Sequence, residues 1–182
     1  MSNLVLRALT GTAFVAVLVG SILLSPWSFT LLFALVTGLT LWEFADNVNL
    51  HAGARVNKLI NAVSGVYLFL AFAGYCSGYQ GSEVFIPYLL SLMYLPISEL
   101  YAKNWAYAFA SQLYIALPFS LLNCLAFLND PLKQQAYFHW LLPLSVFIFL
   151  WTSDTGAYCT GSLLHKRFPA KLFERISPNK SW

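Results

Sequence analysis

Residues 8–42 read ALTGTAFVAVLVGSILLSPWSFTLLFALVTGLTLW and contain no Asp, Glu, Lys or Arg over 35 positions. A membrane-spanning helix needs roughly 20 predominantly apolar residues, so this stretch is long enough for two of them. Only Ser25-Pro26 interrupts the apolar run, close to its middle. The stretch therefore predicts two membrane helices, 6–24 and 26–45, separated at that break.

The composition of the whole chain leads to the same class of protein. Of the 182 residues, 59% are hydrophobic and only 9% are charged, and the mean hydropathy is +0.66. Soluble domains carry about 25% charged residues, so this chain could not cover a soluble domain of its size. The composition also excludes a disordered or fibrous protein and argues against a partner that is a nucleic acid. We expect an integral membrane protein.

Four further apolar runs follow along the chain, and they predict spans at 59–77, 82–101, 104–128 and 136–153. The second of these has the shortest charge-free core, 84–98. The runs show no alternation of polar and apolar residues, so helices are expected rather than a transmembrane barrel. The predicted fold is an all-α, polytopic membrane helix bundle of about six helices, with residues 1–182 as a single integral membrane domain.

The distribution of basic residues predicts the orientation, because loops on the cytoplasmic side carry an excess of Lys and Arg. With six spans and the N-terminus inside, Lys133 is the only basic residue that would lie outside. Without the fourth span, the basic C-terminal tail would move outside and the excess would disappear. We therefore expect both termini in the cytoplasm, which in a bacterium makes this a multi-pass protein of the inner (cell) membrane. The basic residues expected on the cytoplasmic side are Arg7, Arg55, Lys58, Lys103, Lys166, Arg167, Lys171, Arg175 and Lys180.

Polar residues in or beside a span are energetically costly and need an explanation. Glu43 and Glu99 lie at the cytoplasmic ends of two predicted spans, where each either marks the interface or faces a cytoplasmic cavity. Gln112 and Asn123 in the fifth predicted span are expected to form hydrogen bonds between helices. His139, near the outer interface, is expected to be structural.

Asp154 is a stronger candidate for chemistry. It closes the last apolar run, Gly156 and Gly161 follow it, and a basic stretch occupies 165–180. A carboxylate can hold a divalent cation, glycines let a backbone approach a phosphate, and Lys and Arg neutralise phosphate charge. Residues 154–182 thus read as a metal-phosphate region at the cytoplasmic face. An interfacial Asp followed by an ordinary basic tail explains the spacing equally well.

Two blocks of sequence carry a resemblance to a known family. Asp-Thr-Gly-Ala-Tyr at 154–158, followed by Gly161 and Lys166, and Ile-Ser-Pro-Asn-Lys-Ser-Trp at 176–182 resemble the CDP-diacylglycerol synthase (phosphatidate cytidylyltransferase) family. The close match covers roughly residues 150–182. His165 and Asn179 depart from the family pattern, and the family's later signature is absent. We therefore expect the N-terminal part of a longer family fold, incomplete or inactive by itself.

The resemblance implies transfer of a cytidylyl group from CTP to phosphatidate, giving CDP-diacylglycerol and diphosphate, with Mg²⁺ as cofactor. It implies catalytic roles for Asp154, Lys166 and Lys180, with Asp154 also binding the metal and the two lysines contacting phosphates. Membrane lipid and a second copy of the chain, in a homodimer, are the other partners it suggests. By the same resemblance, the substrate-binding residues are Gly156, Gly161, Ser177 and Pro178.

Other functions remain as alternatives. A CDP-alcohol phosphotransferase would need a series of spaced aspartates, whereas Asp occurs only at 46, 130 and 154. A transporter or channel-type subunit would place polar residues at mid-membrane depth in broken helices. A CTP-dependent polyprenol kinase relative would use the same nucleotide for a different transfer. The sequence leaves the last two open.

Overall fold

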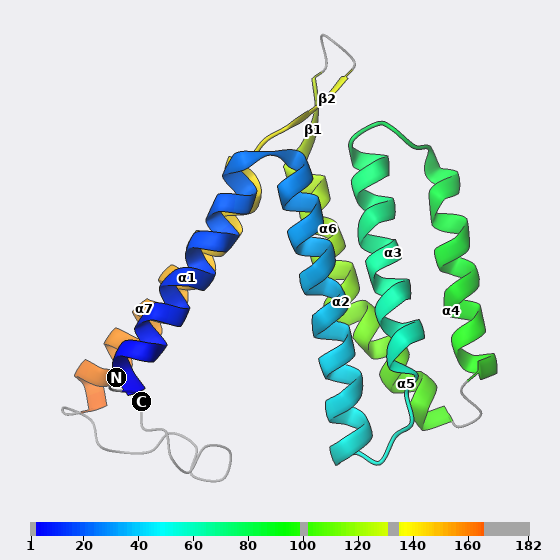
Figure 1. The fold of residues 1–182 in the computed structure, drawn as a ribbon, viewed down its shortest axis with the longest axis horizontal. Helices are drawn as coiled ribbons and strands as arrows, with labels where there is room; N and C mark the ends of the chain where they lie inside the picture. The colour runs from blue at the N-terminus through cyan, green and yellow to red at the C-terminus, as the bar shows by residue number, and fades with distance from the viewer. Residues whose placement is uncertain (1–2, 99–101, 131–134, 166–182) are drawn as a thin grey trace. The chain divides into compact units, whose positions relative to one another are not determined.

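The computed structural model describes residues 3–98, 102–130 and 135–165 and confirms an all-α, helical membrane protein. It divides into two compact units, Met1–Pro143 and Leu144–Trp182. In the first unit, successive helices run up and down beside one another (Figure 1). The described helices of the two units together are α1 (Asn3–Leu24), α2 (Pro26–His51), α3 (Lys58–Cys76), the short η1 (Ser82–Phe85), α4 (Ile86–Ser98), α5 (Ala102–Ser111), η2 (Gln112–Ala116), α6 (Leu117–Ala126) and α7 (Leu141–His165). Most of α7 belongs to the second unit.

The break predicted at Ser25-Pro26 is a capped turn between α1 and α2. The Ser25 hydroxyl accepts a hydrogen bond from the Ser28 amide at 3.0 Å, and the Ser28 hydroxyl accepts one from the Ser25 amide at 3.1 Å. This reciprocal pair satisfies amides that a helix start otherwise leaves unpaired. Pro26 occupies the first helical turn, where its missing N–H costs nothing.

The core of the first unit forms where α2 and α3 lie against each other. Phe29, Phe33 and Leu41 of α2 and Phe69 of α3 are almost completely buried. Gly65 makes the close approach possible, because a Cβ added there would lie 2.0 Å from Leu41 Cδ1. Helices that cannot use the hydrophobic effect inside a membrane depend on such small residues to pack closely.

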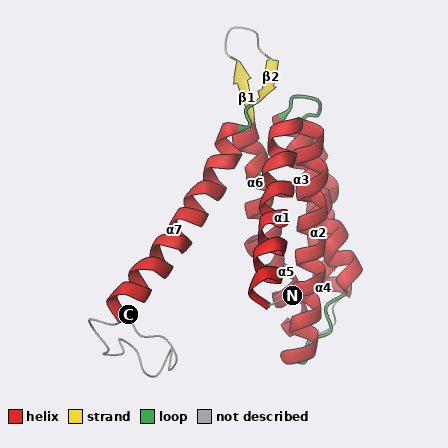
Figure 2. Cartoon of the chain, turned by 60° about the vertical axis from the view of Figure 1, so that its left-hand side comes forward, coloured by secondary structure: helices red, strands yellow, loops and turns green. Residues whose placement is uncertain are grey.

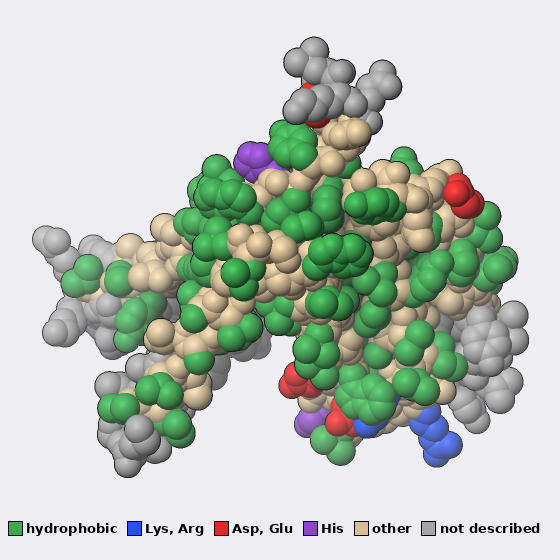
Figure 3. All heavy atoms as spheres, turned by 45° about the horizontal axis from the view of Figure 1, so that its top comes forward, with side chains coloured by type: hydrophobic (Ala, Val, Ile, Leu, Met, Phe, Trp, Pro, Cys, Tyr) green, Lys and Arg blue, Asp and Glu red, His purple; other side chains and the backbone are tan. Residues whose placement is uncertain are grey.

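Charged side chains of the first unit gather mainly at the end of the helices where α2 meets α3 (Figure 3). There, Lys58 forms an ion pair with Asp46, and its ammonium lies 5.9 Å from the centre of the Trp42 ring. The side chain of Asn49 fixes the connecting loop by two hydrogen bonds to the backbone of Val56, at 2.7 and 2.9 Å. The charges therefore mark one membrane face of this unit.

Three helices in the described part of the chain are long and apolar enough to cross a membrane: Pro26–His51, Lys58–Cys76 and Asn104–Ala126. They correspond to the second, third and fifth predicted spans. The first and fourth predicted spans correspond to shorter apolar helices, Leu9–Leu24 and Ser82–Met93. Many large hydrophobic side chains along these helices are exposed, as expected where lipid rather than water surrounds them.

The predicted C-terminal end of the fifth span and the predicted N-terminal start of the sixth span are wrong. A β-hairpin, and not helix, occupies the region between these two spans (Figure 2). Strands β1 (Phe127–Asp130) and β2 (Gln135–Phe138) pair antiparallel, with Phe127 opposite Phe138. Their rings lie 5.6 Å apart, and the His139 amide donates to the Ala126 carbonyl at 2.7 Å. The hairpin satisfies its own backbone groups, and the sixth predicted span consequently begins at Leu141 instead of residue 136.

The fifth predicted span is one continuous helical path with an irregular middle. Residues Gln112–Ala116 form a π-helical turn between α5 and α6. Pro118 follows immediately, and a proline inside a helix removes one backbone donor and crowds the preceding turn. A single wide turn relieves that conflict. Gln112 is the first residue of this turn.

Candidate functional site

The main sequence-predicted site residue, Asp154, lies within helix α7 rather than after it. The prediction that the last span ends at residue 153 is therefore wrong, because the helix continues to His165. Asp154 follows Leu141 by 13 positions, or about 20 Å along the helix axis. It lies in the polar segment 152–155 (Thr-Ser-Asp-Thr), which follows eleven largely apolar residues, 141–151. A carboxylate is thus presented in the second half of a helix whose first half suits lipid.

Asp154 lies in a stretch of α7, residues 152–160, in which every residue is exposed. The side chain is exposed, and it makes no hydrogen bond or ion pair to the other described residues. Helical spacing places Asp154, Tyr158 and Gly161 on one face, because positions i, i+4 and i+7 coincide. Ionisable residues in membrane proteins are costly and commonly functional, so Asp154 is a candidate ligand for a cation.

The two predicted glycines are helical as well. Gly156 lies about 160° around the helix from Asp154 and lines a shallow hollow together with Thr155 and Cys159. A Cβ added at Gly156 would meet nothing within 4 Å. Inside a helix, the backbone N–H groups are already hydrogen-bonded. What these glycines offer a ligand is therefore the absence of a side chain rather than a free amide.

The remaining predicted residues lie outside the described part of the chain: Lys166, Ser177, Pro178 and Lys180, together with Glu99. Their roles stay predictions. Glu43 is exposed at the charged end of α2, where both an interfacial and a cavity-facing role are compatible with its position.

The donor set that a metal would meet is small. Among the described residues, no three His, Cys, Asp or Glu side chains lie close enough to hold a metal ion. Mg²⁺ is commonly bound by one or two carboxylates plus substrate phosphates and water. One exposed carboxylate, that of Asp154, fits that mode and does not fit an all-protein metal cage.

A buried polar cluster connects α3 with the π-helical turn in the first unit. Asn61, Ser111 and Gln112 are each at most 1% exposed. The Asn61 side-chain oxygen accepts hydrogen bonds from Gln112 Nε2 at 2.8 Å and from the Ser111 hydroxyl at 3.0 Å. Gln112 Nε2 also donates to the Asn61 carbonyl at 2.9 Å. The prediction that Gln112 bonds between helices is confirmed, and Asn61 is a partner that the sequence analysis missed.

Asn123 makes the second predicted contact between helices. Its Nδ2 donates to the Phe69 carbonyl of α3 at 3.3 Å and to the Ser120 carbonyl at 3.0 Å. Within the described residues, Asn61 Nδ2 and Asn123 Oδ1 are buried without a hydrogen-bond partner. The hydrogen bonds of Asn123 therefore hold α6 against α3.

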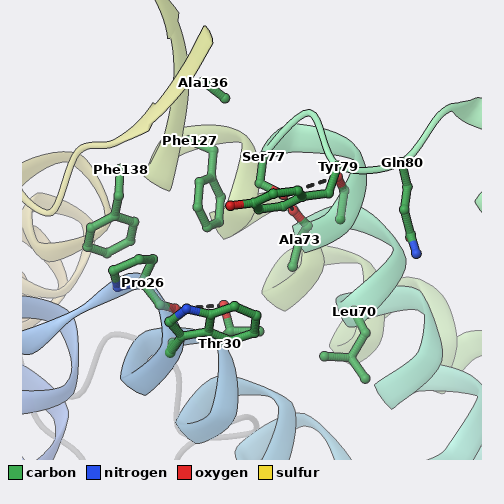
Figure 4. A pocket seen from close by; sticks show the side chains of 12 residues that line it. Pro26, Thr30, Leu70, Ala73, Ser77, Tyr79, Gln80, Phe127, Ala136 and Phe138 are labelled. Atoms are coloured by element: carbon green, nitrogen blue, oxygen red, sulfur yellow. Dashed lines mark hydrogen bonds between the residues drawn. The ribbon is translucent and has the colours of Figure 1, made fainter.

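A cavity of about 400 Å³ in the first unit lies beside the hairpin (Figure 4). Phe127 and Phe138 of the hairpin and Pro26 of α2 form its apolar side, and Ser77 and Gln80 contribute polar groups. All twelve lining residues are uncharged, so the cavity offers no cation to a triphosphate. It is at the opposite end of α2 and α3 from the Asp46–Lys58 ion pair.

Comparison with known proteins extends the resemblance beyond the two motif blocks. The profile described as "Cytidylyltransferase family" matches residues 5–182. A phosphatidate cytidylyltransferase of Haemophilus influenzae is 26% identical over 187 residues, which cover 92% of this chain and 62% of the relative. This chain therefore spans less than two thirds of the relative's length. No solved structure matches.

Proposed function

This chain belongs to the Cytidylyltransferase family. We propose that it functions as part of a phosphatidate cytidylyltransferase. A phosphate oxygen of phosphatidate attacks the α-phosphorus of CTP, the bond to the β,γ-diphosphate breaks, and CDP-diacylglycerol forms. The observation that carries the proposal is the accessible Asp154 in the polar second half of α7, within the Asp-Thr-Gly-Ala-Tyr block. Phosphatidate is a lipid and CTP is water-soluble, so the reaction needs polar groups beside an apolar surface.

Each residue of this region has a proposed part in the reaction. Asp154 holds the cation that accompanies the nucleotide, and Gly161 on the same face leaves room for a phosphate next to the helix. Lys166 and Lys180 neutralise phosphate charge, while Ser177 and Pro178 contact the substrate. When bound, Mg²⁺ offsets the negative charge that accumulates on the phosphates. The protein's own contribution is to orient the two phosphates and to position the positive charges.

The proposed orientation supplies both substrates at one face. The charged ends of α2 and α3, with Lys58 and Asp46, are assigned to the cytoplasm, because basic residues accumulate there. CTP then reaches Asp154 from the cytoplasmic side of the membrane, which is the inner (cell) membrane if the source is bacterial. We further propose that two copies associate as a homodimer in that membrane.

The experiment that tests the proposal replaces the matching 62% of the Haemophilus influenzae relative with this chain. Membranes containing the chimera receive CTP, phosphatidate and Mg²⁺, and CDP-diacylglycerol is measured by mass spectrometry. We expect product that depends on CTP. Membrane insertion and solubility in mild detergent are checked on the same preparation. A chimera that is inserted and soluble but yields no product would refute the proposal.

Asp154→Asn in this chimera is expected to lower the rate by at least about 100-fold, the scale for loss of one group that stabilises charge in a transition state. Glu83→Gln is the matched control, because it makes the same carboxylate-to-amide change at an exposed position in η1 and should leave the rate unchanged. Equal rates in the two variants would remove Asp154 from the site.

A further inference from the structure

The thiols of two cysteines from distant parts of the chain lie side by side. Cys76 is the last residue of α3 and Cys124 is in α6, and their Sγ atoms are 3.5 Å apart. Both are free thiols in this structure; Cys76 is half-buried and Cys124 is exposed. A disulfide bond requires about 2.05 Å between the sulfur atoms. The remaining distance of about 1.5 Å is on the scale of a side-chain rotation.

Well-packed elements, rather than loops, hold both cysteines. Directly before Cys124, Asn123 donates to the Phe69 carbonyl of α3 at 3.3 Å. Directly after Cys76, the Ser77 amide closes α3 by donating to the Ala73 carbonyl at 3.1 Å. The encounter of the two thiols is thus built into the contact between α3 and α6 and does not depend on a chance approach of mobile segments.

The pair lies at the membrane face that carries the hairpin. Cys124 is three residues before β1 and Cys76 ends α3, whereas the Asp46–Lys58 ion pair is at the other end of α2 and α3. In the orientation proposed above, this is the external face. Disulfides persist outside the cytoplasm and are rare inside it, so the surroundings favour oxidation of thiols at that face.

We propose that Cys76 and Cys124 are a modification site, at which a reversible disulfide joins α3 to α6 beside the hairpin. A small disulfide such as oxidised glutathione can supply the oxidation. One protein thiolate attacks it, forming a mixed disulfide and releasing glutathione. The second protein thiolate then displaces the other glutathione. Two protein thiols are oxidised and one glutathione disulfide is reduced to two thiols, so electrons and protons balance. This inference does not rest on the proposed cytidylyl transfer.

The test uses the purified 182-residue chain in mild detergent, treated with excess oxidised glutathione, quenched with a maleimide and mapped by peptide mass spectrometry. We expect a disulfide-linked peptide pair that contains Cys76 and Cys124. In Cys76→Ser, Cys124 should instead keep a bound glutathione, because no second thiol displaces it. Cys159→Ser is the matched control and should retain the link. Free or separately glutathionylated cysteines in the wild-type chain would overturn the proposal.

A second readout follows the stability of the protein. The disulfide would close the loop from Cys76 to Cys124. This closure should raise the Tm of the oxidised wild-type chain by roughly 5–15 °C over that of the reduced chain. The rise should disappear on reduction with dithiothreitol, and it should be absent in Cys76→Ser. If that variant does not fold, the Tm of the oxidised wild-type chain before and after reduction still shows whether the disulfide stabilises the protein. An unchanged Tm in a chain whose link is present would refute the claim that the bond fastens two helices.

Discussion

The close approach of α2 to α3 at Gly65 allows the effect of one substitution on stability to be predicted from the structure. In Gly65→Ala, the new Cβ would lie 2.0 Å from Leu41 Cδ1 and 3.1 Å from Ala116 Cβ. Ordinary contacts between carbon atoms are about 3.5–4.0 Å, and both neighbours are completely buried. Overpacking of this kind costs about 1–3 kcal/mol, while replacing Gly by Ala in a helix returns about 1 kcal/mol. We therefore expect Gly65→Ala to lower the free energy of unfolding by up to about 2 kcal/mol.

Gly20→Ala is the matched control, because it makes the same change within α1, where an added Cβ meets nothing within 4 Å. It should leave stability unchanged or raise it by up to about 1 kcal/mol. Both variants are unfolded in mixed micelles by increasing amounts of a denaturing detergent, and far-UV circular dichroism gives the midpoint. If Gly65→Ala is more stable than the wild type by about 1 kcal/mol, the gain of an unhindered Gly-to-Ala change in a helix, then α2 and α3 do not approach as described.

Three further predictions concern the buried cluster, the orientation and the metal. A double-mutant cycle of Asn61→Ala and Gln112→Ala should give a coupling of about 0.6 kcal/mol, and at most about 1.7, as for other hydrogen bonds between membrane helices; additive effects would contradict the 2.8 Å contact. In a background without other cysteines, Gln80→Cys should react with a membrane-impermeant maleimide on intact cells, and Asn47→Cys only after permeabilisation; the reverse pattern would invert the proposed orientation. Removing Mg²⁺ with EDTA should abolish product formation by the chimera and adding excess Mg²⁺ should restore it, whereas activity that persists in EDTA would show that Asp154 does not act through Mg²⁺.

The sequence allowed the helical membrane class to be predicted because long charge-free runs have few other stable structures in a bilayer. The boundary at Ser25-Pro26 was readable for a local reason: Ser, Pro and Ser at 25, 26 and 28 cap a helix by themselves. The contacts of Gln112 and Asn123 were also predictable, because a polar side chain inside a span needs a partner.

Features that depend on contacts between distant segments were not predictable in this way. Strands β1 and β2 are four residues each, too short for their alternation to stand out from the adjoining apolar runs. The π-helical turn depends on how Pro118 fits among neighbouring helices as well as on its presence. Asn61 follows Lys58 by three positions, so it reads as part of a polar helix start, and only packing shows that it is buried.

Part of the candidate site could be predicted and part could not. Asp154 was identifiable because it ends an apolar run ahead of glycines and basic residues. The end of the helix was not identifiable, since polar residues within a span and polar residues after it give the same local pattern. Finding Asp154 inside α7 changes what Gly156 and Gly161 can contribute, from backbone amides to open space beside the helix.

The central claim is that a cytidylyl group, and not a phosphoryl group, is transferred to the lipid. The measurement that tests it most directly supplies the chimera with phosphatidate and with CTP labelled at either the α- or the γ-phosphorus. We predict that the α-label appears in the lipid and the γ-label appears only in released diphosphate. A γ-label in the lipid would mean CTP-dependent phosphorylation, the chemistry of a polyprenol kinase relative, and would contradict the account.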